Sequence, residues 1–356
     1  MIAIVGGGAI GLSCAWRLAQ SGARVTLFES GEVGREASFA AGGMLAPTPE
    51  YMLHNGSAAP ALLVLSVDSC DLYAEFAAEL LDLTGHDIEL SLFESPTHDW
   101  RTPGIMLVSS CVGKGKKRLD WNGQRASWLE EEGQVEPRQL TRALRVACEQ
   151  AGVCLRENTP VRGFDVKNNR VQKLRLDGES FEADHFLLCA GAWSGQRLGL
   201  PAKATPPIRP VAGQMLQLRG ERRLKHIVYG ENCYLIPRRD GRLLVGATVE
   251  ETGFAKRVTA AGTAQLLNAA LELAPILNDA PLETSWAGLR PVSPDGLPIL
   301  GGGPIENLSY ATGHGRNGIL LAPRTAEVIV SYLLRGESVP KAFGLERFVE
   351  TATYRV

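Results

Sequence analysis

The sequence predicts an α/β protein that has a Rossmann-like dinucleotide-binding domain, discontinuous in the chain, and a second α+β domain with an antiparallel sheet. Three observations lead to this prediction. A short apolar strand at residues 2–5 runs into a glycine-rich turn and a helical pattern. Two later strands also end in glycine turns, near residues 189–194 and 313–318. From residue 206 the sequence alternates between apolar and polar residues, as in half-buried strands.

The first turn carries a dinucleotide-binding fingerprint, in which Gly6, Gly8 and Gly11 satisfy G-x-G-x-x-G. The first glycine permits the tight turn, the second lets a pyrophosphate approach the backbone, and the third lets the helix pack on the strand. The helix N-terminus then offers free N–H groups to the phosphates. Glu29 ends the next strand and is placed to accept hydrogen bonds from a ribose. The alternative is a purely structural turn, and the motif does not distinguish FAD from NAD.

The segment that follows, Glu36 to Met44, is dense in small residues. Such density indicates a close approach of the backbone to something bulky, either a flavin or tight helix packing. Helices are predicted at residues 61–83 and 137–150, with Pro137 as the first residue of the second one. Residues 86–110 read as two strands around a turn at Pro96.

The remaining elements follow from periodicity and turn signals. Strands are predicted at 153–156, 161–166, 171–176, 181–188, 211–218, 233–237, 243–248, 297–300 and 308–312, with helices at 259–273 and 319–334. The turn at 238–241 joins two of these strands as a hairpin. We expect residues 1–80, 137–206 and 287–356 to form the dinucleotide-binding domain, and residues 81–136 and 207–286 the second domain.

The bulk properties exclude several classes. The 356 residues carry a formal net charge of −2, which gives no electrostatic footprint for nucleic acid or an anionic membrane. The one basic run, at residues 114–118, is read as a solvated loop. Seven scattered cysteines without C-x-x-C favour neither a disulfide framework nor a zinc site and suit a reducing compartment. The first strand leaves no room for a signal peptide, and no apolar run is long enough to span a membrane, so we expect a cytoplasmic protein. A homo-oligomer is left open.

Six segments carry a resemblance to the D-amino-acid oxidase family of flavoproteins, and within it to the glycine oxidases of bacterial thiamine biosynthesis. They are VGGGAIGLSCAWRLAQSG, FESGEVGREASFAAGGMLAP, CAGAWS, CYLIPRRDGRLLVGAT, WAGLRPVSPDGLPILG and GHGRNGILLAP. The resemblance covers nearly the whole chain, and its last three segments are much more specific than the fingerprint. It implies FAD rather than NAD, together with the two-domain fold of that family.

The resemblance also implies which residues contact the cofactor. Gly6, Gly8, Ala9, Ile10 and Gly11 would surround the pyrophosphate, while Glu29 and Ser30 hold the ribose and Val161 meets the adenine. The flavin would be lined by Ala37, Ser38, Gly42, Gly43, Met44, Gly191, Trp193, Gly288, His314, Gly315, Arg316, Asn317, Gly318, Ile319 and Leu320. The helix that begins near Gly318 would direct its N-terminal dipole toward the reduced flavin.

On the substrate side, Arg290 matches the arginine that binds the carboxylate, and Tyr234 matches the tyrosine above the ring. A guanidinium pairs with a planar carboxylate in a bidentate fork that lysine does not reproduce. Arg316 is also expected at the substrate pocket. The alternatives from the residues alone are a structural salt bridge for Arg290 and a plain strand aromatic for Tyr234.

Two residues differ from those of the glycine oxidases, so the resemblance supports the type of reaction more strongly than it supports glycine as the substrate. Asn232 stands where the glycine oxidases can carry His, and Val249 where they can carry Met, so both are assigned to the substrate pocket. Covalent-flavin sarcosine oxidases have a cysteine before the equivalent of residues 293–295, where this chain has Gly288. Non-covalent FAD is therefore expected.

The sequence thus predicts an FAD-dependent oxidase of glycine and related small amines such as sarcosine or small D-amino acids. It would use molecular oxygen, release hydrogen peroxide, an oxo acid and ammonia, and serve thiamine biosynthesis. Hydride transfer to flavin N5 needs orientation more than a strong base, so no general base is named. One alternative is an amine dehydrogenase with a non-oxygen acceptor. Another is a tRNA-associated flavin module, which the neutral charge argues against.

Overall fold

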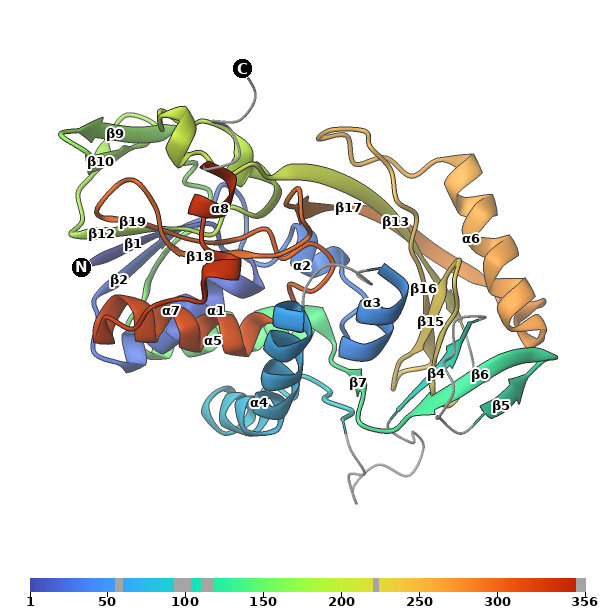
Figure 1. Cartoon of the computed structure of the whole chain (residues 1–356). Coiled ribbons are helices and arrows are strands. Elements are labelled where there is room, and N and C mark those ends of the chain that lie inside the picture. Colours follow the sequence, from blue (N-terminus) through green and yellow to red (C-terminus); the bar gives the residue numbers. More distant parts are fainter. Residues whose placement is uncertain (55–59, 93–103, 110–117, 220–223, 350–356) are drawn as a thin grey trace.

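The computed structural model describes residues 1–54, 60–92, 104–109, 118–219 and 224–349. The predicted turn at Pro96, the basic residues 114–117 and Cys111 lie outside these ranges. Two large sheets lie next to each other (Figure 1). One sheet is mostly parallel and contains both the first strand of the chain and the strand that begins at Leu308. The other sheet is mostly antiparallel and is covered by one long helix. The predicted fold class is confirmed.

The parallel sheet has six strands in the order β18-β19-β12-β1-β2-β8. Their bounds are β1 (Ile2–Val5), β2 (Val25–Phe28), β8 (Cys154–Arg156), β12 (His185–Leu188), β18 (Ile299–Gly302) and β19 (Leu308–Thr312). All neighbours pair in parallel except β18, which runs antiparallel to β19. Because parallel strands share one carboxyl edge, the three predicted glycine turns meet at that edge.

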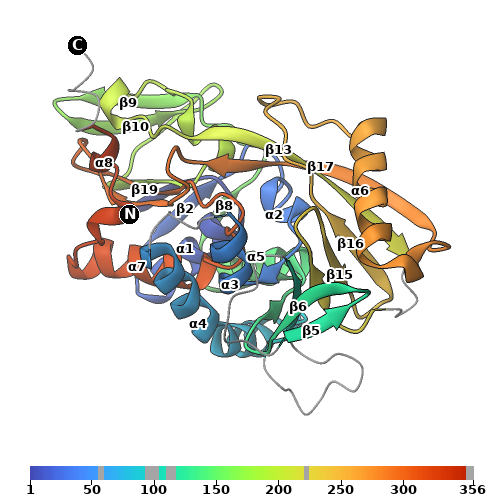
Figure 2. The same cartoon turned by 45° about the vertical axis from the view of Figure 1, so that its right-hand side comes forward.

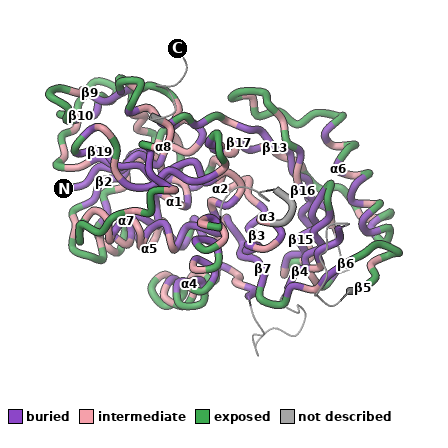
Figure 3. The backbone as a smooth tube through the Cα atoms, viewed as in Figure 1, coloured by how far each residue is buried: buried purple, intermediate pink, exposed green. Residues whose placement is uncertain are grey.

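Successive side chains of β1 point to opposite faces of the sheet, so each face needs its own apolar cover. Ile2 and Ile4 pack into a core with the helices on one side, and Ala3 and Val5 pack into a separate core on the other. The helices are α1 (Ala9–Gln20), α4 (Pro60–Thr84), α5 (Pro137–Gln150) and α7 (Ala322–Arg335). The second face is covered by a small sheet of β9 (Gly163–Lys167), β10 (Arg170–Arg175) and β11 (Ser180–Phe181). Figure 3 shows the central strands buried between these layers.

The helix ends follow local chemistry. The N-terminus of α5 has Pro137 at its first position, and the Glu136 side chain accepts a hydrogen bond from the Arg138 N–H. Gly336 ends α7 in the left-handed conformation, with φ of 71°. This helix begins at Ala322 rather than near Gly318, because residues 317–321 form a turn in which the Leu321 N–H donates to the Asn317 carbonyl.

The second large sheet has eight strands in the order β17-β13-β16-β15-β14-β4-β6-β5. Their bounds are β4 (Ile105–Val108), β5 (Arg118–Trp121), β6 (Gln124–Leu129), β13 (Arg209–Arg219), β14 (Ile227–Tyr229), β15 (Tyr234–Pro237), β16 (Arg242–Gly246) and β17 (Leu282–Val292). One face packs on α6 (Ala260–Leu273), which Figure 2 shows lying over the sheet, through a core that includes Leu235 and Leu266. The other face presents Tyr234 and Ile236. The predicted hairpin at 238–241 is confirmed by the antiparallel pairing of β15 with β16.

Short elements complete the chain. They are α2 (Ala37–Ala40), β3 (Met44–Leu45), α3 (Pro47–His54), β7 (Gly133–Gln134), α8 (Glu346–Val349) and the 3₁₀ turns Gly191–Gly195, Ala202–Ala204, Pro275–Leu277 and Lys341–Phe343. The sequence pattern does not predict β5, β6 or β14. The predicted strand at 181–188 is divided into β11 and β12. Within the described part of the chain, no helix has the length and apolar character needed to cross a bilayer.

Candidate active site

A cavity of about 400 Å³ lies at the carboxyl edge of the parallel sheet and extends to the Tyr234 face of the second sheet. Its walls come chiefly from segments 5–10, 28–30, 36–44, 160–162, 189–193, 288–291 and 311–319. Among the residues assigned to the cofactor, those that line it are Gly6, Gly8, Ala9, Ile10, Glu29, Ser30, Ala37, Ser38, Gly42, Gly43, Met44, Val161, Gly191, Trp193, Gly288, His314, Gly315, Arg316, Asn317, Gly318 and Ile319. The cavity therefore gathers segments from all three glycine turns.

The first turn has the geometry that the fingerprint requires. Gly6 has φ of 109°, and a Cβ there would lie 2.4 Å from the Cys189 carbonyl oxygen. A Cβ on Gly11 would lie 1.9 Å from the Gly6 carbonyl oxygen, so Gly11 serves helix–strand packing and does not line the cavity. Glu29 is fixed at the strand end, where its Oε2 accepts from the Gly7 N–H at 2.8 Å and its Oε1 from the Ser30 hydroxyl at 3.0 Å.

The small residues of 36–44 satisfy both interpretations of that segment. A Cβ on Gly42 would lie 2.7 Å from Ile236 Cδ1, and one on Gly43 would lie 2.2 Å from the Val135 carbonyl oxygen, so protein packing excludes side chains at both positions. Both glycines also line the cavity. The segment is therefore a thin wall between the cavity and strand β15.

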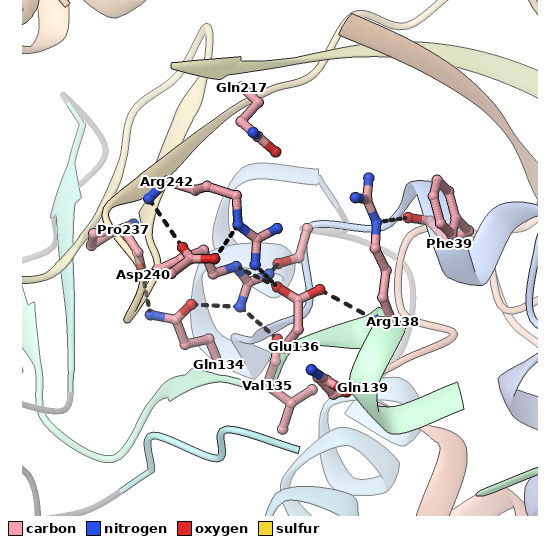
Figure 4. Close-up of polar contacts among 12 residues, drawn as sticks. Phe39, Gln134, Val135, Glu136, Arg138, Gln139, Gln217, Pro237, Asp240 and Arg242 are labelled. Atoms are coloured by element: carbon pink, nitrogen blue, oxygen red, sulfur yellow. Dashed lines mark hydrogen bonds and ion pairs between the residues drawn. The ribbon is translucent and has the colours of Figure 1, made fainter. Parts of the chain in front are cut away.

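A buried arginine, Arg238, fixes this thin wall from behind. Figure 4 shows the neighbouring polar side chains of Gln134, Glu136 and Arg242. The Arg238 side chain is fully buried, and its Nη2 donates to the Gly42 carbonyl at 2.6 Å. Its Nη1 donates to Gln134 Oε1 and to the Val135 carbonyl, each at 2.8 Å. Glu136 Oε2 lies 3.4 Å from Arg238 Nε and 3.2 Å from Arg242 Nη2. Burial lowers the pKa of Arg238, while the Glu136 carboxylate opposes that shift.

Arg290 lies at the other end of the cavity, on β17 opposite Val211. Its Nη1 donates to the Ala212 carbonyl at 3.2 Å and the Thr248 carbonyl at 3.1 Å. No carboxylate of the described residues forms an ion pair with it, so nothing in that part of the chain supports the alternative of a structural salt bridge. Burial lowers the pKa of Arg290, which the neighbouring Tyr234 partly offsets. A guanidinium held by two carbonyls keeps donors available for an anion.

Tyr234 is buried beside Arg290 and lines the same cavity. Its hydroxyl donates to Met215 Sδ at 3.2 Å. A Cβ on Gly246 would lie 2.5 Å from its ring, so that glycine makes room for the aromatic side chain. Burial raises the pKa of Tyr234, with Arg290 and Arg316 acting in the opposite direction, and the phenol therefore stays protonated at neutral pH.

Arg316 interacts with Glu50 and Tyr229. The sequence predicted Arg316 at the pocket but not these two partners. Its Nε lies 3.1 Å from Glu50 Oε2, and its Nη2 donates to the Tyr229 hydroxyl at 3.1 Å. The Tyr229 hydroxyl in turn donates to Glu50 Oε1 at 2.7 Å. Glu50 lines the cavity and Tyr229 packs against Tyr234, with ring centroids 5.8 Å apart. No local sequence signal marked Glu50 or Tyr229, because both act through partners distant in the chain.

His314 lines the cavity as a neutral imidazole. Its Nε2 lies 3.1 Å from the Thr325 hydroxyl, and burial lowers its pKa to about 3. The described residues contain no group of His, Cys, Asp and Glu side chains that could hold a metal ion.

Four predicted placements need correction, the first being Gly11, which packs the helix on the strand and does not line the cavity. Asn232 and Val249 do not line the cavity: Asn232 is exposed in the turn between β14 and β15, and Val249 is 64% exposed beyond the end of β16. Both are removed from the candidate substrate pocket. Leu320 is buried in the helical core and contributes no surface to the cavity.

Comparisons with known proteins agree with this geometry. A family model described as FAD dependent oxidoreductase (DAO) matches residues 1–332. The glycine oxidase of Pseudomonas aeruginosa strain PAO1 is 36% identical over 354 residues, covering 95% of this chain and 96% of that protein. The bifunctional protein ThiO/ThiG of Trichormus variabilis is 35% identical over 374 residues, covering 99% of this chain. That match spans 56% of the relative, so the chain covers about half the length of such bifunctional relatives.

The same relationship holds for the three-dimensional structure. The crystal structure of glycine oxidase from Geobacillus kaustophilus superimposes with a TM-score of 0.86 at 32% identity, covering 97% of each chain. The resemblance drawn from the six segments is thereby confirmed, and so is FAD as the cofactor. The chain belongs to the DAO family of FAD-dependent oxidoreductases.

Proposed function

We propose that the chain oxidises glycine and small D-amino acids to an oxo acid and ammonia, and the related amine sarcosine to an oxo acid and methylamine. Molecular oxygen is the proposed electron acceptor, hydrogen peroxide the second product, and thiamine biosynthesis the context. The names of the relatives support this proposal, since they include glycine oxidases and ThiO fusions of about the same similarity.

The observation that carries the proposal is the guanidinium of Arg290, which lines the cavity and forms no ion pair with a carboxylate of the described residues. A half-buried cation that lacks a carboxylate partner in the described chain is costly unless a ligand supplies one. The carboxylate of an amino acid fits this requirement and can pair through two parallel N–H···O bonds. Arg290 would thus fix one end of the substrate. The protonated hydroxyl of Tyr234 stands beside it and would donate to the substrate if it turned from the thioether of Met215, a weak acceptor.

The neighbouring ionisable groups are poor candidates for a general base. Glu50 is engaged by Arg316 and Tyr229, and His314 has a pKa of about 3 because it is buried. The residues therefore bind and orient the amine rather than remove its proton, which is what transfer of a hydride requires. Bound FAD supplies the acceptor for that hydride.

The residues present fit FAD. A helix N-terminus and Glu29 stand at one end of the cavity for the phosphates and ribose. At the other end, the thin wall of Gly42 and Gly43 leaves room for a planar ring. We also propose the domain division given by the sequence, with residues 1–80, 137–206 and 287–356 holding FAD and residues 81–136 and 207–286 covering the substrate.

The decisive assay measures peroxide release by the purified yellow protein in air, with glycine, sarcosine, D-alanine and D-proline as separate substrates. We expect turnover of at least one of them. If none is turned over, the proposal fails. If flavin is reduced by substrate but reoxidised only by an artificial acceptor, the protein is a dehydrogenase and the oxygen-dependent part of the proposal is wrong.

A further inference from the structure

Glu50 is a buried carboxylate that faces the cavity. It is 6% exposed, and helix α3 carries it to the cavity wall near Tyr234. Its Oε1 accepts a hydrogen bond from the Tyr229 hydroxyl at 2.7 Å, while its Oε2 lies 3.1 Å from Arg316 Nε. Burial and the nearby carboxylate raise the pKa of Tyr229, so this phenol remains a donor to Glu50. The carboxylate is thus held in place on both oxygens.

Apart from Arg290, each charged side chain that lines the cavity has a partner of opposite charge or backbone N–H donors. Arg162 is paired with Asp177 at 2.7 Å, and Glu36 is paired with Lys256 at 2.6 Å. Arg316 is paired with Glu50. Glu29, at the far end, is held by backbone N–H groups. Among the described residues, Arg290 is therefore the one cavity guanidinium without a carboxylate partner.

Near Tyr234 the fixed charges are Arg290, Arg316 and Glu50, which leave a net charge of one positive unit. This balance matches one substrate carboxylate and disfavours two, because a second anion would have to compete with Glu50 for Arg316. Removal of the Glu50 charge would turn Arg316 into a second free guanidinium at the same cavity wall. A half-buried cation of this kind binds an available anion through charge-assisted hydrogen bonds.

We propose that Glu50 is a specificity-determining residue: by occupying Arg316, it restricts the pocket to amines that carry a single carboxylate. The inference rests on the proposed function for its choice of substrates. It makes no assumption about which small amine is preferred. It predicts that the neutral, isosteric variant Glu50→Gln will accept amines with two carboxylates.

The first experiment measures binding without turnover. The holoprotein is titrated with acetate and with malonate, and the change in flavin absorption gives the dissociation constant of each. The quantity compared is the dissociation constant of acetate divided by that of malonate. We expect this ratio to be at least about tenfold larger in Glu50→Gln than in the wild type, because Arg316 is then free to pair with the second carboxylate of malonate. The second experiment compares kcat/KM for iminodiacetate and glycine, and this ratio should rise about as much.

Matched variants separate this role from a structural one. Glu251→Gln removes an exposed carboxylate that pairs with Arg209, so it changes the net charge equally but should leave both ratios unchanged. The double variant Glu50→Gln/Arg316→Met should return the malonate-to-acetate ratio to that of the wild type. Tyr229→Phe keeps the Glu50 charge and should also keep the ratio.

A well-folded Glu50→Gln holoprotein with unchanged ratios would overturn the inference. If Glu50→Gln does not retain FAD, Arg316→Gln provides the test, because it leaves Glu50 unpaired and should weaken malonate binding more than acetate binding. Equal weakening of the two ligands would overturn the inference in that case. A malonate shift in a protein that oxidises none of the amines supports the charge role of Glu50 and rejects the proposed function.

Discussion

The guanidinium of Arg290 lies against the backbone of Gly213, its diagonal neighbour across the β13–β17 pair. A Cβ on Gly213 would lie 2.3 Å from Nη1 and 2.4 Å from Nη2. The absence of a side chain at 213 is therefore what lets Arg290 lie flat along the cavity wall and donate to the Ala212 carbonyl. The position of the proposed carboxylate-binding group depends on a glycine on the neighbouring strand.

The first prediction follows from this contact. Gly213→Ala should displace the guanidinium by about 1 Å and lower kcat/KM for glycine by about 100-fold, because misplacement of this size costs that much in an oriented reaction. The flavin spectrum should remain close to that of the wild type, since Arg290 and not the FAD wall is moved. Normal kcat/KM in the alanine variant would mean that Arg290 does not hold the substrate.

The second prediction concerns the chemistry of Arg290 itself. Arg290→Lys keeps the charge but loses the planar fork, so kcat/KM should fall about 100- to 1,000-fold, mainly through KM. The measurement is steady-state peroxide release over a range of substrate concentrations. Arg219→Lys is the matched control: this arginine lies on β13, is 41% exposed and pairs with Glu283, so its replacement should change neither parameter.

The third prediction concerns Arg238, which supports the thin wall of Gly42 and Gly43. Arg238→Met removes the donor to the Gly42 carbonyl and leaves the buried Glu136 carboxylate with less compensation. We expect a loss of about 3–5 kcal/mol in the free energy of unfolding and weaker retention of FAD. Urea unfolding and the ratio of flavin to protein absorbance check the two effects.

The control for Arg238 is Arg209→Met, which breaks an ion pair between side chains that are both more than half exposed. It should cost less than about 1 kcal/mol and leave FAD content unchanged. If Arg238→Met retains wild-type FAD affinity despite lower stability, the arginine supports the fold alone and does not position the wall.

The site residues that the sequence predicted are those that belong to a short contiguous motif. Gly6 and Gly11 belong to one turn, and Arg290 stands inside a segment specific to the family resemblance. Glu50 and Tyr229 lie outside the six segments. Arg238 lies inside one of them, but its role is not indicated there because its partners are far along the chain. Tyr229 contacts Glu50 across 179 residues and Arg238 contacts Gly42 across 196.

The local backbone explains why Asn232 and Val249 do not line the cavity. Asn232 would share a face with Tyr234 if strand β15 continued backward, since side chains two residues apart point the same way. The chain instead turns between Tyr229 and Tyr234, where the Gly230 N–H donates to the Cys233 carbonyl, and Asn232 is exposed. Val249 lies beyond the last residue of β16, where the strand no longer determines its side-chain direction.

The fourth prediction is a loss of stability in mild acid that arises from buried histidines. Burial lowers the pKa of His185 to about 4, with Arg170 acting in the same direction, and lowers the pKa of His314 to about 3. Both lie below the ordinary value of 6.5, so the unfolded chain binds protons between pH 6.5 and 4 that the folded protein does not. Stability should be fully present above pH 6.5 and should fall as the pH decreases through this window.

His185 tests the origin of this loss because its Nε2 lies 2.8 Å from the Ser309 hydroxyl and neither residue lines the cavity. One proton taken up only on unfolding gives a slope of about 1.4 kcal/mol per pH unit. In His185→Gln, the slope of the unfolding free energy between pH 6.5 and 4 should decrease by about this amount, as measured by urea unfolding at several pH values. Above pH 7 the difference between variant and wild type should be constant. An unchanged slope below pH 6.5 would show that His185 is already protonated in the folded protein, and would assign the acid sensitivity to other groups.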